Sequence, residues 1–431
     1  MPNERIAKIA VLFAVTMLLV LGCALQKTSR TLMKTPVGLV AGLPHPGENH
    51  HETSHCPTED VPVFVVSGRN VEDRCALDPF GTERSQEPTL GIAYVKIGEG
   101  LTQAELRCET TTDCGHKKAQ VEFSKVDLID KPQELGTFEA NEHVVRHGNN
   151  PWVQAVEQQL NRSQNRKVTI FVHGFNTEFI DNTLLAAEIY HYLGRQGAIV
   201  SFEWPSETRV LGYLADKGNA NSSTRQFRTL ISNLAKDCQV DSITIIAHSA
   251  GSPIVVNALR EIRLLENEKS AAEVRNKYRV DRVVLAAPDM DLGAFINAIY
   301  DRFYEVATGI AVYASPSDRA LRVSEILNGN SRLGRAVGSL QPWESSALQS
   351  ASSIELIDAE VAGRDHRNFL GHSYFHRDPW ISSDIGAFVL GRSIPERSLV
   401  RRQGEIFYRF PDDYPDRLRA RATSLTMPRL N

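Results

Sequence analysis

The sequence has no marked excess of charge of either sign: 48 lysine and arginine residues face 52 aspartate and glutamate residues, for a net charge of −4. Composition therefore gives no reason to expect nucleic acid or an anionic membrane surface as a partner. No internal repeat is found, which excludes a repeat architecture. Apolar residues make up 42% and charged residues 23% of the 431 residues, as in globular proteins. The length allows one large domain with an appendage, or two domains.

No apolar run is long enough to cross a bilayer comfortably; the longest, Ile9–Leu21, has 13 residues and follows two basic residues. This pattern predicts a signal peptide over residues 1–22. The ending VLGC resembles a bacterial lipobox, in which the Cys23 thiol receives lipid chains such as palmitate; a plain secretory signal or an uncleaved anchor are the alternatives. Ala24 is not the Asp that holds many lipoproteins in the inner membrane. We therefore expect a lipoprotein of the bacterial cell envelope, anchored in the outer membrane and facing the periplasm.

Residues 23–60 contain Gly, Pro, Ser and Thr with little periodicity, which predicts a flexible tether. A histidine-rich tract within it is a candidate for metal binding, but no spacing fits a fixed metal site, so we expect a solvated linker and no metal. Its histidines are His45, His50, His51 and His55.

Cysteine is scarce, with six residues in the whole chain. Four of the five beyond Cys23 fall close together, and in an oxidising periplasm two disulfides among them are plausible, with all three pairings open. These four are Cys56, Cys75, Cys108 and Cys114. The fifth, Cys238, ends a helical pattern and is expected to be a buried or free thiol.

The predicted folded domain spans residues 61–391 and has two parts. Residues 61–148 hold β-branched runs bounded by Gly, Pro and Asp, which predict a β-rich section. Its runs are VPVFVVSGR, LGIAYVKIG, AQVEFSKVDLI and ELGTFEA. We expect the first strands to extend the main sheet and the rest to form an excursion pinned by disulfides.

From residue 150 to 391, strands and helices alternate, which is typical of a parallel sheet covered on both faces. The expected helices lie at 152–161, 179–196, 222–238, 253–269, 318–328 and 378–391, with strands at KVTIFVHG, AIVSFEW, SITIIAHS, RVVLAAPD, GIAVYAS and SIELIDAEV. Residues 329–352 are expected to form a Gly/Ser-rich loop. The Arg-rich residues 392–431 are expected to form an extended, solvated tail, with contact to anionic lipid headgroups as the alternative.

The chain is organised around the stretch TIIAHSAG, in which a β-branched run leads through Ser249 into a helix-compatible segment. A strand, a sharp turn at a Ser and a helix make up the nucleophile elbow of hydrolases. Such a turn needs small residues two before and two after the Ser, here Ala247 and Gly251. The alternative is a buried strand followed by a helix whose Ser is only an N-cap.

In a parallel sheet, polar residues at the carboxyl ends of the strands meet at one edge, where ligands bind. After KVTIFV comes His173-Gly174-Phe175-Asn176, and the Phe175 N–H is the expected first oxyanion donor, with the Ala250 N–H as the second. His173 itself need not react, and a structural role for it fits equally well. The 206–222 loop, with Tyr213 and Asp216, is a candidate wall of the pocket.

A nucleophilic Ser needs a base, and the base needs a carboxylate that orients it. The acid usually follows the second strand after the nucleophile strand, where Asp318 lies; Asp289, one strand earlier, is the alternative. His366, His372 and His376 follow the last strand, and the Gly-led sequence GHSYF favours His372 as the base.

With these motifs, the chain resembles an uncharacterised bacterial family of α/β-hydrolases that are esterase- or lipase-like. The matching stretches are FVHGFNT, FEWPS, GYLAD, AHSAGS, VVLAAPDMD, VYASPSDRAL, IELIDA and GHSYF. The resemblance implies an α/β-hydrolase fold and a Ser249–His372–Asp318 site, and it supplies no substrate. Members carry Met where this chain has Ala250, a change that leaves the backbone N–H in place.

We therefore expect a lipid-anchored serine hydrolase of carboxylic esters, including lipid esters, that needs no metal or organic cofactor. The segment between Asp291 and Gly309 is too short for the large cap of many lipases, which predicts a fairly open site. Acyl transfer or thioester hydrolysis on the same triad is the second hypothesis. A non-catalytic envelope protein that uses the fold to bind a partner is the third.

Overall fold

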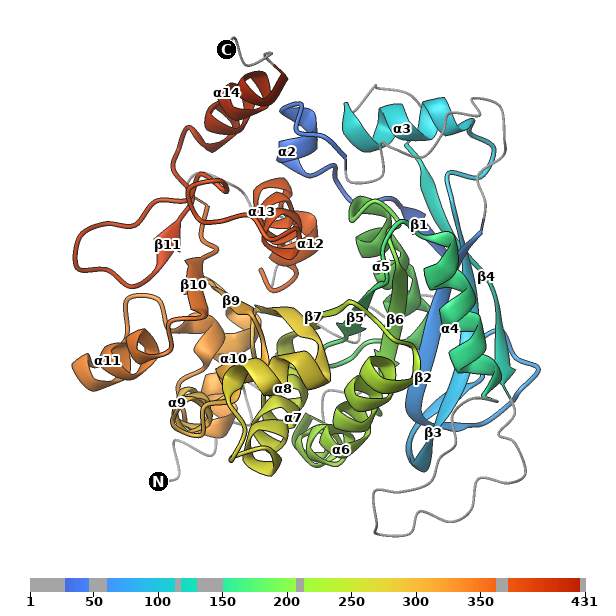
Figure 1. Ribbon diagram of the computed structural model, residues 1–431, viewed down its shortest axis with the longest axis horizontal. Coiled ribbons are helices and arrows are strands. Elements are labelled where there is room, and N and C mark those ends of the chain that lie inside the picture. Colours follow the sequence, from blue (N-terminus) through green and yellow to red (C-terminus); the bar gives the residue numbers. More distant parts are fainter. Residues whose placement is uncertain are drawn as a thin grey trace.

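An eleven-stranded sheet forms the centre of the computed structural model, in the order β1-β4-β3-β2-β6-β5-β7-β8-β9-β10-β11 (Figure 1). The structure describes residues 28–45, 60–112, 118–129, 150–206, 213–361 and 371–426. The strands are β1 (Ser29–Thr31), β2 (Val61–Val71), β3 (Phe80–Ile97), β4 (Gln120–Ile129), β5 (Lys167–Val172), β6 (Ala198–Glu203), β7 (Ser242–His248), β8 (Val280–Ala286), β9 (Gly309–Ala314), β10 (Ile354–Asp358) and β11 (Tyr408–Arg409). Neighbours from β2 through to β11 run parallel, and β3, β4 and β1 extend one edge antiparallel. The predicted α/β class and mostly parallel sheet are confirmed.

Helices cover both faces of the sheet, because its central strands point apolar side chains to both sides. Along β5, Ile170 packs into the cluster under α4, α6 and α7, whereas its neighbour Phe171 packs under α5, α12 and α13. The helices are α2 (Val37–Val40), α3 (Gln103–Thr111), α4 (Pro151–Arg162), α5 (Phe179–Tyr192), α6 (Tyr213–Asp237), α7 (Ser252–Leu265), α8 (Ala271–Tyr278), α9 (Leu292–Tyr300), α10 (Arg319–Asn328), α11 (Pro342–Ser350), α12 (Tyr374–Arg377), α13 (Pro379–Val389) and α14 (Tyr414–Thr426). In the parts of the chain covered above, no helix is long and apolar enough to cross a membrane.

Several helices stand where the sequence interpretation placed none, and three of them share one feature. These are α3 in the β-rich section, α8 after the predicted helix 253–269, and α11 inside the predicted 329–352 loop. Each begins with a capping box, in which the N-cap side chain and a Glu three residues later satisfy each other's backbone N–H groups. Local capping therefore starts these helices despite their weak amphipathic pattern.

The predicted 23–60 tether is wrong for residues 28–45, which are folded. The β1 strand pairs antiparallel with β4, and α2 packs against α13 and lies beside α14 (Figure 1). The Gly38 N–H donates to Ser383 Oγ at 3.0 Å, and Arg30 forms an ion pair with Glu188, which is buried. These contacts fix a segment whose own composition gives no sign of structure. His50, His51 and His55 lie outside the described residues.

The prediction of an extended, solvated tail at 392–431 is also wrong for residues 392–426. The β11 strand pairs parallel with β10, and α14 buries Tyr414 and Leu418 against the domain. Arg397 is fully buried and donates from Nε and Nη2 to the two oxygens of Asp384 at 2.8 and 2.6 Å. The arginine content of this segment predicted exposed side chains, but Arg397 is buried inside the fold and paired with a carboxylate.

The β-rich section differs from expectation in two ways. The AQVEFSKVDLI run is β4, a full member of the sheet, whereas ELGTFEA lies outside the described residues. Cys108 on α3 is disulfide-bonded, but Cys75 is free and exposed, so the expected pair of disulfides does not form. Cys75 precedes the 18-residue strand β3 and Cys108 follows it, which keeps them at opposite ends of the sheet. Cys238 is buried and free, as predicted.

Candidate active site

The chain makes a strained turn at Ser249, between β7 and α7. Its backbone φ is +50°, a left-handed value that costs a non-glycine residue about 1–3 kcal/mol. A Cβ on Gly251 would lie 2.4 Å from the backbone oxygen of His173, so only glycine lets β5 pass this close. Ala247, on the other side of the turn, is fully buried. The predicted strand–turn–helix geometry, with its two small residues, is present.

One continuous chain of hydrogen bonds joins the three residues that the sequence singled out. His372 Nε2 lies 2.7 Å from Ser249 Oγ, and His372 Nδ1 lies 2.7 Å from Asp318 Oδ2. Asp318 is fully buried at the N-cap of α10, where its second oxygen accepts from the Leu321 N–H at 3.0 Å. The helix start thus fixes the carboxylate, and the carboxylate fixes the imidazole. Both distances suit a nucleophile, its base and an orienting group.

The surroundings of His372 stabilise the protonated form of its imidazole. Burial alone would lower the pKa of His372, but the charge and hydrogen bond of Asp318 outweigh burial, so its pKa lies above the ordinary value. Asp289 adds to this effect from farther away.

Asp289, the alternative acid, is engaged elsewhere. Ser324 Oγ donates to its Oδ1 at 2.6 Å, and the buried Arg332 faces the same oxygen at 3.3 Å. Since Asp318 already occupies His372 Nδ1, the geometry favours Asp318 over Asp289 as the orienting acid.

The loop after β5 lies directly against Ser249. A Cβ on Gly174 would come within 3.0 Å of Ser249 Cβ and 2.8 Å of His248 Nδ1, which explains why this position is glycine. The Asn176 N–H donates to Ser206 Oγ at 3.0 Å, which ties the loop to the end of β6. The backbone of residues 174–176 is therefore held beside the site where an oxyanion would form.

A buried polar cluster supports this loop from behind. His173 Nδ1 donates to the Gly174 carbonyl at 2.8 Å, and Arg69 donates to the Thr177 carbonyl at 2.8 Å. Glu203 lies 3.6 Å from His173 Nε2, and burial raises its pKa to about 7. His173 is thus structural, as the sequence allowed. The sequence interpretation missed Arg69 and Glu203, although both stand at strand ends.

His248, the residue before the nucleophile, was also missed. Its Nε2 donates to the backbone carbonyl of His372 at 3.2 Å, and the two rings lie 4.8 Å apart. Burial, with the nearby charge of His372, lowers the pKa of His248 to about 3, so the ring stays neutral and keeps this bond. The sequence signal that could have identified His248 is its position directly before Ser249.

The other predicted features fall away from the triad or outside the described residues. The described part of the chain does not include His366, residues 207–212 or the side chains of Tyr213 and Asp216. His376 lines a separate cavity beside α12. The segment after Asp291 forms α9 and packs into the core, with no cap domain there. Within the described residues, no cluster of three or more His, Cys, Asp or Glu side chains could hold a metal ion.

Residues 151–391 match the model of a family described as "Alpha/beta hydrolase of unknown function (DUF900)", which covers more than half of the chain. An uncharacterised protein from Nostoc sp. is 28% identical over 152 residues; the match spans 30% of this chain and 40% of that relative.

Among solved structures, esterase B from Lactobacillus rhamnosis is similar over 55% of this chain and 77% of its own, at 16% identity and a TM-score of 0.31. An esterase of Pyrococcus furiosus is similar over 53% of this chain and 84% of its own, at 10% identity and a TM-score of 0.30. The family match and the strand order agree with each other, and the chain belongs to this family of α/β-hydrolases of unknown function.

Proposed function

We propose that this hydrolase is a serine esterase that cleaves carboxylic esters. The observation that carries the proposal is the unbroken Ser249–His372–Asp318 hydrogen-bond chain, with 2.7 Å at both links. A strained, buried nucleophile beside an oriented imidazole is the arrangement that covalent acyl transfer requires.

In the proposed reaction, Ser249 Oγ attacks the ester carbonyl while His372 Nε2 takes its proton. The N–H groups of Phe175 and Ala250 stabilise the negative oxygen that forms. His372 then gives the proton to the departing alcohol, which leaves an acyl group on Ser249. Water, deprotonated by His372, then attacks this acyl-enzyme; the acyl–Oγ bond breaks, His372 returns the proton to Ser249 Oγ, and the carboxylic acid leaves. Asp318 keeps the Nδ1 proton in place and stabilises the imidazolium in both halves.

The proposed setting is the cell envelope, with Cys23 lipidated and the protein held in the outer membrane. Support comes only from the sequence of residues 1–24, which lies outside the described residues. A lipid anchor would bring the site close to lipid esters, so we include lipids among the candidate substrates.

Turnover of p-nitrophenyl esters of increasing chain length, by the full chain and by Ser249→Ala, tests the proposal. We expect turnover by the wild type only, and the chain-length profile separates small esters from lipid esters. A folded wild type that turns over no ester, with and without lipid vesicles, would instead support the partner-binding hypothesis. Faster reaction when an alcohol acceptor replaces water would favour acyl transfer, and preference for thioesters would favour a thioesterase.

A further inference from the structure

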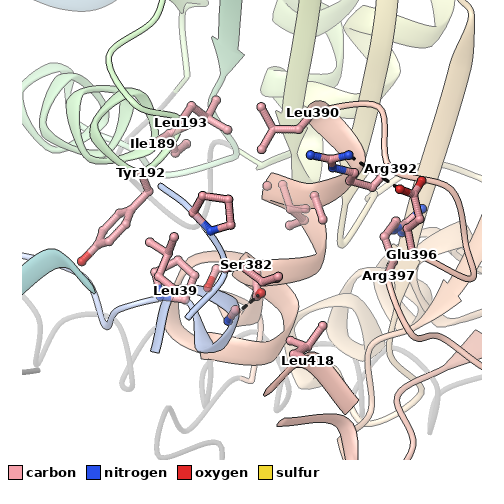
Figure 2. A pocket seen from close by; sticks show the side chains of 18 of the residues that line it. Leu39, Ile189, Tyr192, Leu193, Ser382, Leu390, Arg392, Glu396, Arg397 and Leu418 are labelled. Carbon is pink, nitrogen blue, oxygen red and sulfur yellow. Dashed lines mark hydrogen bonds and ion pairs between the residues drawn. The ribbon is translucent and has the colours of Figure 1, made fainter. Parts of the chain in front are cut away.

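A cavity lies on the α13 side of the sheet, and no triad residue lines it. It has a volume of about 140 Å³ between α2, α5, α13 and α14 (Figure 2). Its wall is mostly apolar, with Leu39, Leu193, Leu390 and Leu418 among its side chains. Two of the segments that close it, 28–45 and 392–426, are those whose folding the sequence did not predict. They give this domain a pocket that the parallel core alone does not form.

Arginine side chains line one end of the cavity. Arg392 and Arg421 both line it and share a single carboxylate, that of Glu396, at 3.6 and 3.1 Å. Arg397 also lines it, but Asp384 and Glu355 compensate its charge. At this end, two guanidinium groups thus face a single carboxylate beside an apolar wall (Figure 2).

Two further observations indicate that the cavity accommodates a ligand. Ser382 is 8% exposed and lines the cavity, and its hydroxyl has no hydrogen-bond partner among the described residues. Gly386 stands inside helix α13, where glycine costs about 1 kcal/mol relative to alanine. A Cβ added to Gly386 would meet no atom within 4 Å, so packing does not demand glycine there. Its missing side chain keeps the cavity open.

We propose that this cavity binds a fatty acid, with its alkyl chain along the leucines and its carboxylate at Arg392 and Arg421. An apolar cavity of about 150 Å³ holds one benzene molecule, so about six carbons of an alkyl chain fit inside a cavity of this size. That size matches one alkyl chain and excludes the two chains of a phospholipid. Phe375 lines the cavity, and its ring lies 4.7 Å from that of His248, so the occupant sits one aromatic ring away from the residue that holds the His372 loop.

The test is photolabelling of the full chain in phosphatidylcholine nanodiscs with a diazirine-bearing dodecanoic acid, followed by mass spectrometry of the labelled peptides. Ser249→Ala is used throughout, so the result does not depend on the proposed esterase. We expect adducts on α2, α5 or α13 that unlabelled saturated fatty acids displace. Competition should strengthen about fourfold for each added methylene and level off near six carbons.

Matched variants locate the site. Gly386→Trp should abolish labelling, whereas Gly386→Ala should retain it, and thermal unfolding should show that both are folded. Arg392→Gln with Arg421→Gln should weaken competition by dodecanoate about tenfold and leave dodecanol unchanged. Arg402→Gln, whose side chain is 74% exposed and does not line the cavity, is the charge-matched control.

Equal labelling of Gly386→Trp and wild type would overturn the proposal. Equal competition by dodecanoate, dodecanol and dodecyltrimethylammonium would also overturn it, since it would show an apolar cavity without an anion site. A further outcome is a yield of adducts that depends only on the amount of phospholipid in the nanodiscs. If added phospholipid lowers the yield and added fatty acid does not, the occupant is a membrane lipid and the fatty-acid proposal is rejected.

Discussion

Replacing Asp318 by Asn should separate catalysis from stability more cleanly than any other change in the site. The side chain has two roles: one oxygen faces His372 Nδ1 at 2.7 Å, and the other accepts the Leu321 N–H at 3.0 Å. Asn keeps the capping oxygen, and Asn and Asp are equally good N-caps, so the unfolding free energy should change by less than about 1 kcal/mol. The carboxylate charge at the imidazole is lost.

We expect kcat for an ester substrate to fall about 10⁴-fold in Asp318→Asn, because the imidazole is no longer held in the required tautomer. This fall corresponds to about 5 kcal/mol of lost transition-state stabilisation. The assay is p-nitrophenyl ester turnover by the full chain, beside urea denaturation of the same samples.

Asp289→Asn is the matched control, since it removes the same charge one strand away. It leaves the buried Arg332 without its carboxylate and should cost about 3–5 kcal/mol of stability, with kcat of the folded fraction within about tenfold of wild type. A 10⁴-fold loss in Asp289→Asn with little loss in Asp318→Asn would refute the assignment of the acid.

Three further predictions concern the base, the elbow and the tail. His372 must be neutral to act, and its pKa is raised, so kcat/KM should rise with pH through a midpoint above about 6.5 and shift to lower pH in Asp318→Asn; an unchanged midpoint would count against the pairing. Gly251→Ala should lose about 1–3 kcal/mol in urea denaturation, because its Cβ meets a backbone oxygen at 2.4 Å; wild-type stability would contradict that contact. Arg397→Met leaves Asp384 buried without its partner and should cost about 3–5 kcal/mol by the same assay, whereas a solvated tail would show no loss.

The sequence predicted the parts of the site that strand ends specify. In a parallel sheet, residues far apart in the chain meet at one edge, so the order of strands alone placed Ser249, Asp318 and His372 together. The hydrogen bonds then decided between Asp318 and Asp289, which sequence spacing ranked but did not separate.

The sequence failed where tertiary packing, not local pattern, creates structure. Residues 28–45 fold because β4 and α13 offer them an edge and a face, and the tail folds because Asp384 and Glu355 receive Arg397. Arg69, Glu203 and His248 support the loops beside Ser249 through single contacts that leave no periodic trace in the sequence. Helices α3, α8 and α11 could have been predicted from the sequence, since their capping boxes are local sequence signals.

The central claim is that Ser249 is a nucleophile activated by His372. The most direct test is to treat the full chain with a fluorophosphonate and to locate the adduct by peptide mass spectrometry, beside Ser249→Ala and His372→Ala. We predict one adduct on Ser249 in the wild type, none in Ser249→Ala, and much slower labelling in His372→Ala. A folded wild type without an adduct, or one labelled at another residue, would contradict the claim.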